Sequence, residues 1–168
     1  MTHYFCGVDL GAFGALVMLD ARGALVAAHP TPLTGGVADI AEARRIVASL
    51  PGPYVVFVEQ PVKVLRGGTS DTGYTALVAS LKFWRAAFGK VPLTLVHPRT
   101  WQAAIIGNVA GATTKAKSIK WTRVFIPSLD LMPGKRTVPS DGLADAACIA
   151  EYARRATSSS SPAPPAAG

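Results

Sequence analysis

The chain has 168 residues, 49% of them hydrophobic, and its 17 lysines and arginines outnumber its ten acids to leave a net charge of +7. This length is enough for one domain with a buried core, and the hydrophobic content excludes a largely disordered chain. No apolar run reaches the ~20 residues of a membrane-spanning helix, and residues 1–4 lack the basic start of a signal peptide. The two cysteines are too few for a disulfide framework, while the basic balance favours a polyanionic partner such as nucleic acid.

The first half of the chain alternates apolar runs with turns. The pattern predicts three antiparallel strands in a meander, at residues 4–10, 14–19 and 24–28. Apolar side chains then recur at helical spacing over residues 37–50, which predicts an amphipathic helix that ends before Pro51. The continuous apolar run at 54–58 is typical of a central strand covered on both faces.

The second half is mainly helical. The predicted elements are a loop at 62–72, a helix at 74–88, a strand at 93–96, a short helix at 98–106, a basic helix at 115–125 and a last helix at 141–155 with Ser140 as its N-cap. We predict one domain at residues 1–156 and a disordered, low-complexity tail at 157–168. The order of elements predicts an α/β fold with a mixed five-stranded sheet flanked by helices on both faces.

The acids are informative because a basic chain holds so few of them. Asp9 ends the first predicted strand and Glu59 follows the central one, where an isolated carboxylate is costly to ionise. Such groups either lie exposed at the sheet end or share a partner such as a cation. Asp141 and Asp145 lie four apart, on one face at the start of the last helix. Capping alone accounts for Asp141 as well as ligation does, whereas Asp145 lies in an apolar stretch of small residues.

A cluster of carboxylates is the ligand set that Mg²⁺ or Mn²⁺ prefers. The histidines and cysteines offer no competing zinc site, since none has a partner at ligand spacing: His3, His29, His97, Cys6 and Cys148. The other six acids are expected in turns or on solvated helix faces: Asp20, Asp39, Glu42, Asp71, Asp130 and Glu151.

Five segments form a pattern by their order and spacing. They are Gly7-Val8-Asp9-Leu10-Gly11 with Gly14-Ala15, Val58-Glu59-Gln60-Pro61, Val96-His97-Pro98-Arg99-Thr100-Trp101, Lys115-Ala116-Lys117-Ser118 and Asp141-Gly142-Leu143-Ala144-Asp145-Ala146. Together they resemble the RuvC-type Holliday junction resolvases, a family with a ribonuclease H-like fold. The resemblance spans about residues 4–155 and is nearest to phage-type and chloroplast-type members. Leu10 and Ser140 depart from it, because the family often has proline at the first position and many phage-type members have histidine at the second.

The resemblance implies a structure-selective endodeoxyribonuclease that resolves four-way (Holliday) DNA junctions by paired symmetric nicks. Asp9, Glu59, Asp141 and Asp145 would hold two Mg²⁺ or Mn²⁺ ions for hydrolysis of a phosphodiester. Lys117 would contact a phosphate near the chemistry and counts with these acids as a catalytic candidate. The expected DNA contacts are Lys63, Arg66, Tyr74, Arg99, Lys115, Lys117, Lys120, Arg123, Lys135 and Arg136.

The resemblance also implies a homodimer, because a four-way junction presents two symmetry-related strands. The apolar side of helix 74–88 is compatible with a dimer interface and equally with an internal core, and Tyr74 with a base contact or with the core. We expect no membrane partner and a cytoplasmic setting, in a bacterium or a phage-infected host, with an organellar matrix as the alternative.

Other functions remain open at this point. Another ribonuclease H-like nuclease, acting on flaps, branched DNA or RNA, would use the same four acids. A sugar-kinase-like ATP site also opens with Gly-Val-Asp-Leu-Gly, but the chain is too short for the two lobes of those enzymes. A non-catalytic nucleic-acid-binding module would not need Glu59 and Asp145 at buried positions.

Overall fold

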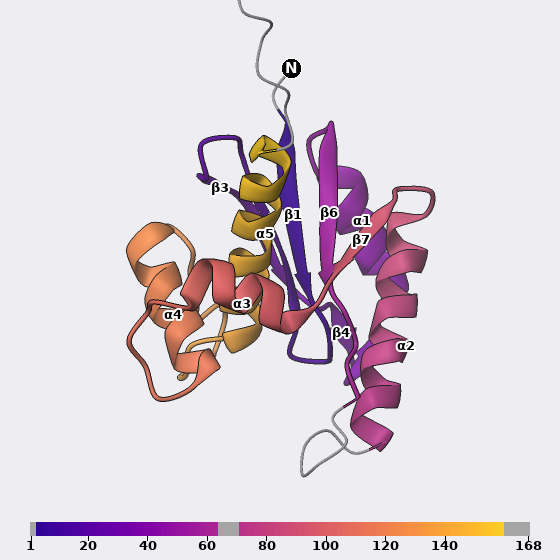
Figure 1. Cartoon of the computed structure of the whole chain (residues 1–168). Helices are drawn as coiled ribbons and strands as arrows, with labels where there is room; N and C mark the ends of the chain where they lie inside the picture. The colour runs from indigo at the N-terminus through magenta and orange to yellow at the C-terminus, as the bar shows by residue number, and fades with distance from the viewer. Residues whose placement is uncertain (1–2, 64–70, 160–168) are drawn as a thin grey trace, which may run out of the picture.

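The computed structural model describes residues 3–63 and 71–159, and Figure 1 shows a central sheet with helices on both sides. The strands of the main sheet are β1 (Tyr4–Asp9), β2 (Ala15–Leu19), β3 (Leu25–Pro30), β6 (Tyr54–Glu59) and β7 (Leu93–Val96). Their order is β3-β2-β1-β6-β7, in which β1 pairs antiparallel with β2 and parallel with β6. The predicted mixed five-stranded sheet is therefore confirmed.

The five helices lie close to their predicted positions. They are α1 (Ile40–Ser49), α2 (Asp71–Phe88), α3 (Pro98–Ile106), α4 (Thr114–Phe125) and α5 (Asp141–Ser159). The helix predicted at 37–50 begins only at Ile40, because the Asp39 side chain caps it by accepting a hydrogen bond from the Glu42 N–H at 2.9 Å. The residues before the cap form a small hairpin that periodicity did not predict, β4 (Leu33–Thr34) with β5 (Val37–Ala38).

The last helix begins where the sequence predicts and ends later. The Ser140 hydroxyl caps α5, accepting a hydrogen bond from the Leu143 N–H at 3.2 Å. The helix continues to Ser159, so the expected end at Arg155 and the expected disorder of residues 157–159 are both wrong. In this final turn the Ser158 hydroxyl donates to the Arg154 carbonyl at 2.8 Å, which joins the added turn to the one before it. Residues 160–168 of the predicted tail lie outside the described residues.

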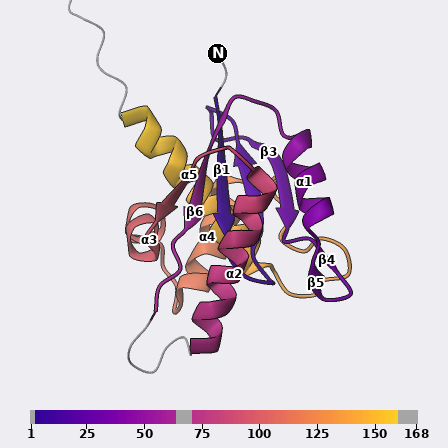
Figure 2. The ribbon, with the colours of Figure 1, turned by 90° about the vertical axis from the view of Figure 1, so that its right-hand side faces the viewer.

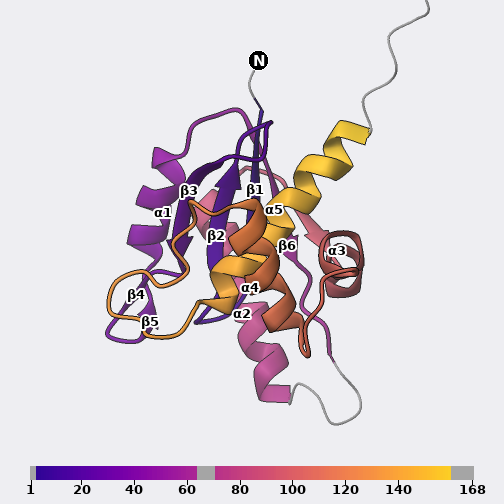
Figure 3. The same cartoon turned by 90° about the vertical axis from the view of Figure 1, so that its left-hand side faces the viewer.

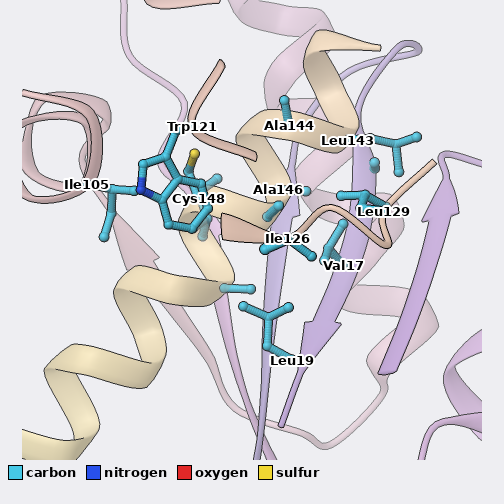
Figure 4. Close-up of a cluster of buried hydrophobic side chains, with 14 of the residues drawn as sticks. Val17, Leu19, Ile105, Trp121, Ile126, Leu129, Leu143, Ala144, Ala146 and Cys148 are labelled. Atoms are coloured by element: carbon cyan, nitrogen blue, oxygen red, sulfur yellow. The ribbon is translucent and has the colours of Figure 1, made fainter. Parts of the chain in front are cut away.

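Alternating side chains of the strands separate two hydrophobic clusters. On β2, Leu16 and Met18 face a cluster completed by α1 and α2, whereas Val17 and Leu19 face α3, α4 and α5. Figure 2 looks onto α2, and Figure 3 looks from the opposite side onto α4 and α5. Figure 4 shows part of the second cluster, where Trp121 of α4 lies beside the buried first half of α5.

Helix α2 contributes to the core of a single chain. Its side chains Leu81, Trp84 and Phe88 are buried against the sheet, and Leu77 packs partly buried beside them. Of the two interpretations left open for this apolar side, the structure supports the internal core. None of the helices in the described part of the chain is both long and apolar enough to cross a membrane.

Helix α5 lies directly on β1 at a glycine. A Cβ atom at Gly7 would stand 2.1 Å from the Ala146 carbonyl oxygen and 2.3 Å from the Ala150 nitrogen. Only glycine allows the two backbones to approach this closely. The contact fixes α5 along β1, with its N-terminus at the end of the sheet where β1 and β6 finish (Figure 1).

Glu151 corrects one expectation from the sequence. It was expected to be solvated, but it is only 5% exposed. Its carboxylate accepts hydrogen bonds from Arg154 at 2.7 Å and from Arg155 at 2.6 Å, and these guanidinium groups compensate for its burial. Arg154 also donates to the Ala21 carbonyl at 3.4 Å, which links α5 to the turn between β2 and β3.

Candidate active site

The end of the sheet collects the four predicted site acids. β1 and β6 run parallel and pair as far as Val8 opposite Val58, so Asp9 and Glu59 are the next residues on neighbouring strands. Asp141 and Asp145 lie in the first turns of α5, which starts at the same edge (Figure 1). Three elements that are distant in sequence thus bring these carboxylates together.

The pKa of Asp9 responds to the charges of the other three acids. Burial raises the pKa of its carboxyl well above the ordinary value, and the negative charges of Asp145, Glu59 and Asp141 raise it further. The hydrogen bond from the Leu10 N–H opposes these effects only in part. Four acids that influence one another in this way form a single electrostatic unit, which favours binding of a proton or a cation.

Glu59 is held by a tryptophan. The indole N–H of Trp101, a fully buried side chain of α3, donates to Glu59 Oε2 at 2.9 Å. Burial raises the pKa of Glu59, and this hydrogen bond lowers it in part. In the sequence, Trp101 stands out only as the last residue of a segment that resembles the family, and nothing local predicts its role. Only the tertiary structure pairs it with Glu59.

Asp145 has an oxygen without a partner. Burial, followed by the charges of Glu59 and Asp141, raises the pKa of Asp145 to about 7, although neighbouring Ser118 and Lys115 oppose the shift. Its Oδ1 is buried and accepts no hydrogen bond from any residue that the structure describes. A buried carboxylate oxygen without a donor suits a ligand that brings positive charge.

Asp141 is paired with Lys115. The Lys115 ammonium forms an ion pair with Asp141 Oδ2 and also interacts electrostatically with Asp145 and Asp9. Burial alone would raise the pKa of Asp141, but the hydrogen bond and charge of Lys115 hold it below its usual value. Asp9, Asp141, Asp145 and Lys115 line a cavity of 270 Å³, called here the acidic cavity, whose lining does not include Glu59.

Lys117 is placed differently from Lys115. Two residues along an α-helix project from different faces, so Lys117 points away from the acids. It lines a separate 250 Å³ pocket between α3 and α4 with Arg99, Gln102 and Thr114. The lysine in contact with the acids is therefore Lys115, whereas a role for Lys117 toward a phosphate stays a prediction.

The acid cluster suits divalent cations by its chemistry. It offers carboxylate oxygens, mutual repulsion and the unpartnered Asp145 Oδ1. As the side chains stand, no three acids, histidines or cysteines of the described residues are close enough to share one ion. Because the Lys115 ammonium pairs with Asp141 Oδ2, an ion that binds this oxygen would have to displace the ammonium.

Comparison with known proteins identifies the fold. No family model and no curated protein matches the chain. Solved structures do match the chain, among them two that cover nearly its whole length. A structure of T. thermophilus RuvC in complex with Holliday junction substrate is 17% identical, with a TM-score of 0.60, and covers 94% of this chain and 96% of its own. A Thermus thermophilus RuvC structure is 18% identical, with a TM-score of 0.56, and covers 95% and 97%.

The chain has the RuvC-type fold. This confirms the ribonuclease H-like architecture inferred from the resemblance. The nearness to phage-type and chloroplast-type members stays a prediction.

The residues predicted to contact DNA lie on several elements of the structure. Lys63 pairs with Asp71 at 2.6 Å, and Tyr74 is half-buried on α2. Four further predicted contacts are exposed on α4 and in the segment before α5: Lys120, Arg123, Lys135 and Arg136. Arg66 lies outside the described residues.

Proposed function

We propose that this chain is a metal-dependent endonuclease that resolves four-way DNA junctions. The observation that carries the proposal is the convergence of Asp9, Glu59, Asp141 and Asp145 at one sheet edge of a protein with net charge +7. The RuvC-type fold supports it, since one of the compared structures is a complex with a Holliday junction substrate.

In this proposal, Asp9, Glu59, Asp141 and Asp145 would hold two Mg²⁺ or Mn²⁺ ions, and these ions would supply Lewis-acid chemistry for hydrolysis of a phosphodiester. Trp101 keeps the Glu59 carboxylate in a fixed orientation through its indole N–H. Lys115 neutralises Asp141 until a ligand replaces it. Lys117 and Arg99 bind a backbone phosphate in their pocket, away from the acids.

The experiment compares a four-way junction, a flap, a duplex and an RNA–DNA hybrid as substrates with Mg²⁺. We expect paired symmetric nicks in the junction alone. The substitutions Asp9→Asn, Glu59→Gln and Asp145→Asn should each reduce cleavage by more than about 100-fold and leave junction binding largely intact. This estimate follows because groups that merely orient metal ligands already contribute about 10- to 100-fold.

Asp130→Asn is the matched control. Asp130 is exposed, and its carboxylate accepts only a local hydrogen bond from the Met132 N–H, which an amide oxygen can also accept. This variant should cut normally. Normal cleavage by Asp9→Asn would disprove the metal site, and preferential cutting of flap or hybrid would replace the resolvase by another ribonuclease H-like nuclease.

A further inference from the structure

The turn between β1 and β2 carries an exposed aromatic ring. Phe13 is 77% exposed, the highest value among the large hydrophobic side chains that the structure describes as exposed. It belongs to neither hydrophobic cluster, so it does not stabilise the core.

The position of Phe13 is more informative than its exposure. Phe13 lines the acidic cavity together with Asp9, Asp141 and Asp145. A DNA strand whose phosphate lies at these acids would therefore pass close to Phe13. By contrast, Tyr74, the aromatic residue that the sequence offered for base stacking, does not line this cavity.

The backbone holds Phe13 firmly beside the acids. The Gly14 N–H donates to the Gly11 carbonyl at 3.1 Å and closes the turn. A Cβ at Gly142, in the first turn of α5, would stand 2.0 Å from the Phe13 carbonyl oxygen, so turn and helix are in direct backbone contact. The ring is thus presented from a fixed base rather than from a long, free loop.

The net charge of the whole chain, +7, favours nucleic acid over another apolar partner. The cavity itself is acidic, and its Lys115 is paired with Asp141, so a phosphate there depends on the cations of the proposed function, while exposed basic side chains of α4 attract the rest of the strand. A nucleobase offers a flat face for stacking on phenylalanine, and it arrives with the phosphate that the basic groups attract. A paired base in an intact duplex is already stacked on both faces, whereas a base at a branch point can be released.

We propose that Phe13 stacks on an unstacked nucleobase beside the phosphate held at the acidic cavity. The inference rests on the proposed function and deepens it, because it assigns a residue that selects opened or branched DNA. Phe13 acts in substrate binding and takes no part in the bond-breaking step.

The test is equilibrium binding of a four-way junction that carries 2-aminopurine at its branch point, with Ca²⁺ in place of Mg²⁺ so that cations remain at the acids while cleavage is suppressed. Phe13→Ala should weaken binding about tenfold and abolish the change in 2-aminopurine emission, as expected for loss of one stacked base. Phe13→Trp should stay within about twofold of wild type, and Phe13→Leu should behave like alanine because it keeps apolar area without a flat ring.

Val37→Ala is the matched control. Val37 is 71% exposed on the β4–β5 hairpin and does not line the acidic cavity. It should leave DNA binding unchanged, and thermal melting should be the same for all these variants, since both side chains are exposed.

Three results would overturn the inference: unchanged binding by Phe13→Ala, wild-type behaviour of Phe13→Leu, or a change in molecular mass in Phe13→Ala that reveals a protein contact. These results leave the proposed function intact provided that the wild type binds and cuts junctions. Wild-type protein that binds no DNA would instead refute the proposed function itself.

Discussion

At the scale of single residues, Asp145 shows that bringing the acids together opposes ionisation of a buried carboxyl. Its carboxyl is buried, one oxygen lacks a hydrogen bond from the described residues, and its pKa is about 7 instead of the ordinary 3.8. Between about pH 4 and pH 7, Asp145 therefore keeps its proton in the folded protein and loses it in the unfolded chain. Stability from this protonated form is complete below pH 4 and is lost as the pH rises toward 7.

We therefore expect Asp145→Asn to stabilise the metal-free protein at pH 8, where the wild type contains a buried charge. The gain should reach at most about 4 kcal/mol, since one pKa unit is worth about 1.4 kcal/mol, and it should diminish toward pH 5. Thermal melts in EDTA from pH 5 to 8 measure it. Mg²⁺ should then stabilise the wild type more than the variant.

The comparison with Asp145→Asn separates Asp145 from Asp9 and Glu59, whose pKa values are also raised, and the chosen pH range separates it from the acids whose pKa values are lowered. The pKa values of Asp39, Asp141 and Glu151 are lowered, so the stability that these groups contribute is lost only as the pH falls through lower values. Asp130→Asn is again the control. Equal melting temperatures of wild type and Asp145→Asn at pH 8 would contradict the inference that the wild type buries the charge of Asp145 at this pH.

At the scale of elements, α5 connects the core to the site. Its first turns carry Asp141 and Asp145, its middle lies on Gly7 of β1, and its later part buries Glu151 between two arginines. The position of the two aspartates therefore depends on a backbone contact several ångströms away from them.

We expect Gly7→Ala to be strongly destabilising, because its Cβ would stand 2.1 Å from the Ala146 carbonyl oxygen and backbone must move to relieve it. The loss should be about 3 kcal/mol or more, above the usual cost of an overpacked side chain. Urea denaturation followed by circular dichroism measures it. Gly52→Ala, where a Cβ meets no atom within 4 Å, is the control, and similar midpoints for both variants would refute the close packing.

At the scale of the whole molecule, the chain separates its charges. Four of the ten acids gather at one sheet edge, while exposed lysines and arginines lie on α4 and before α5. In the proposed function, the DNA backbone and the divalent cations would therefore have distinct binding surfaces. The described residues of one chain hold one such acid cluster. If the proposed function holds, two coordinated nicks in a junction would need two chains.

We predict a homodimer with two independent acid clusters. Light scattering at micromolar concentration should give twice the mass of one chain, and mixed dimers of wild type with Asp9→Asn should nick one strand of each junction only. Wild-type homodimers should nick both strands. A monomer that makes paired nicks would contradict this arrangement.

The sequence by itself determined the five strands of the main sheet and the five helices to within a few residues at their ends, and it singled out the four acids, but it did not predict the β4–β5 hairpin. Strand and helix periodicity, the cap at Ser140 and carboxylates at the ends of apolar runs depend on residues near one another in the chain, and the structure brings those four acids to one edge. The resemblance to RuvC-type proteins supplied the topology, which the fold comparison confirms.

Only the tertiary structure decided how side chains pair across elements. Lys115 rather than Lys117 reaches Asp141, and Trp101 reaches Glu59, because these contacts depend on the rotation of one helix against another element. Glu151 is buried and Phe13 is exposed beside the acids for the same reason. Local patterns determine which residues share a face, whereas packing determines what that face meets.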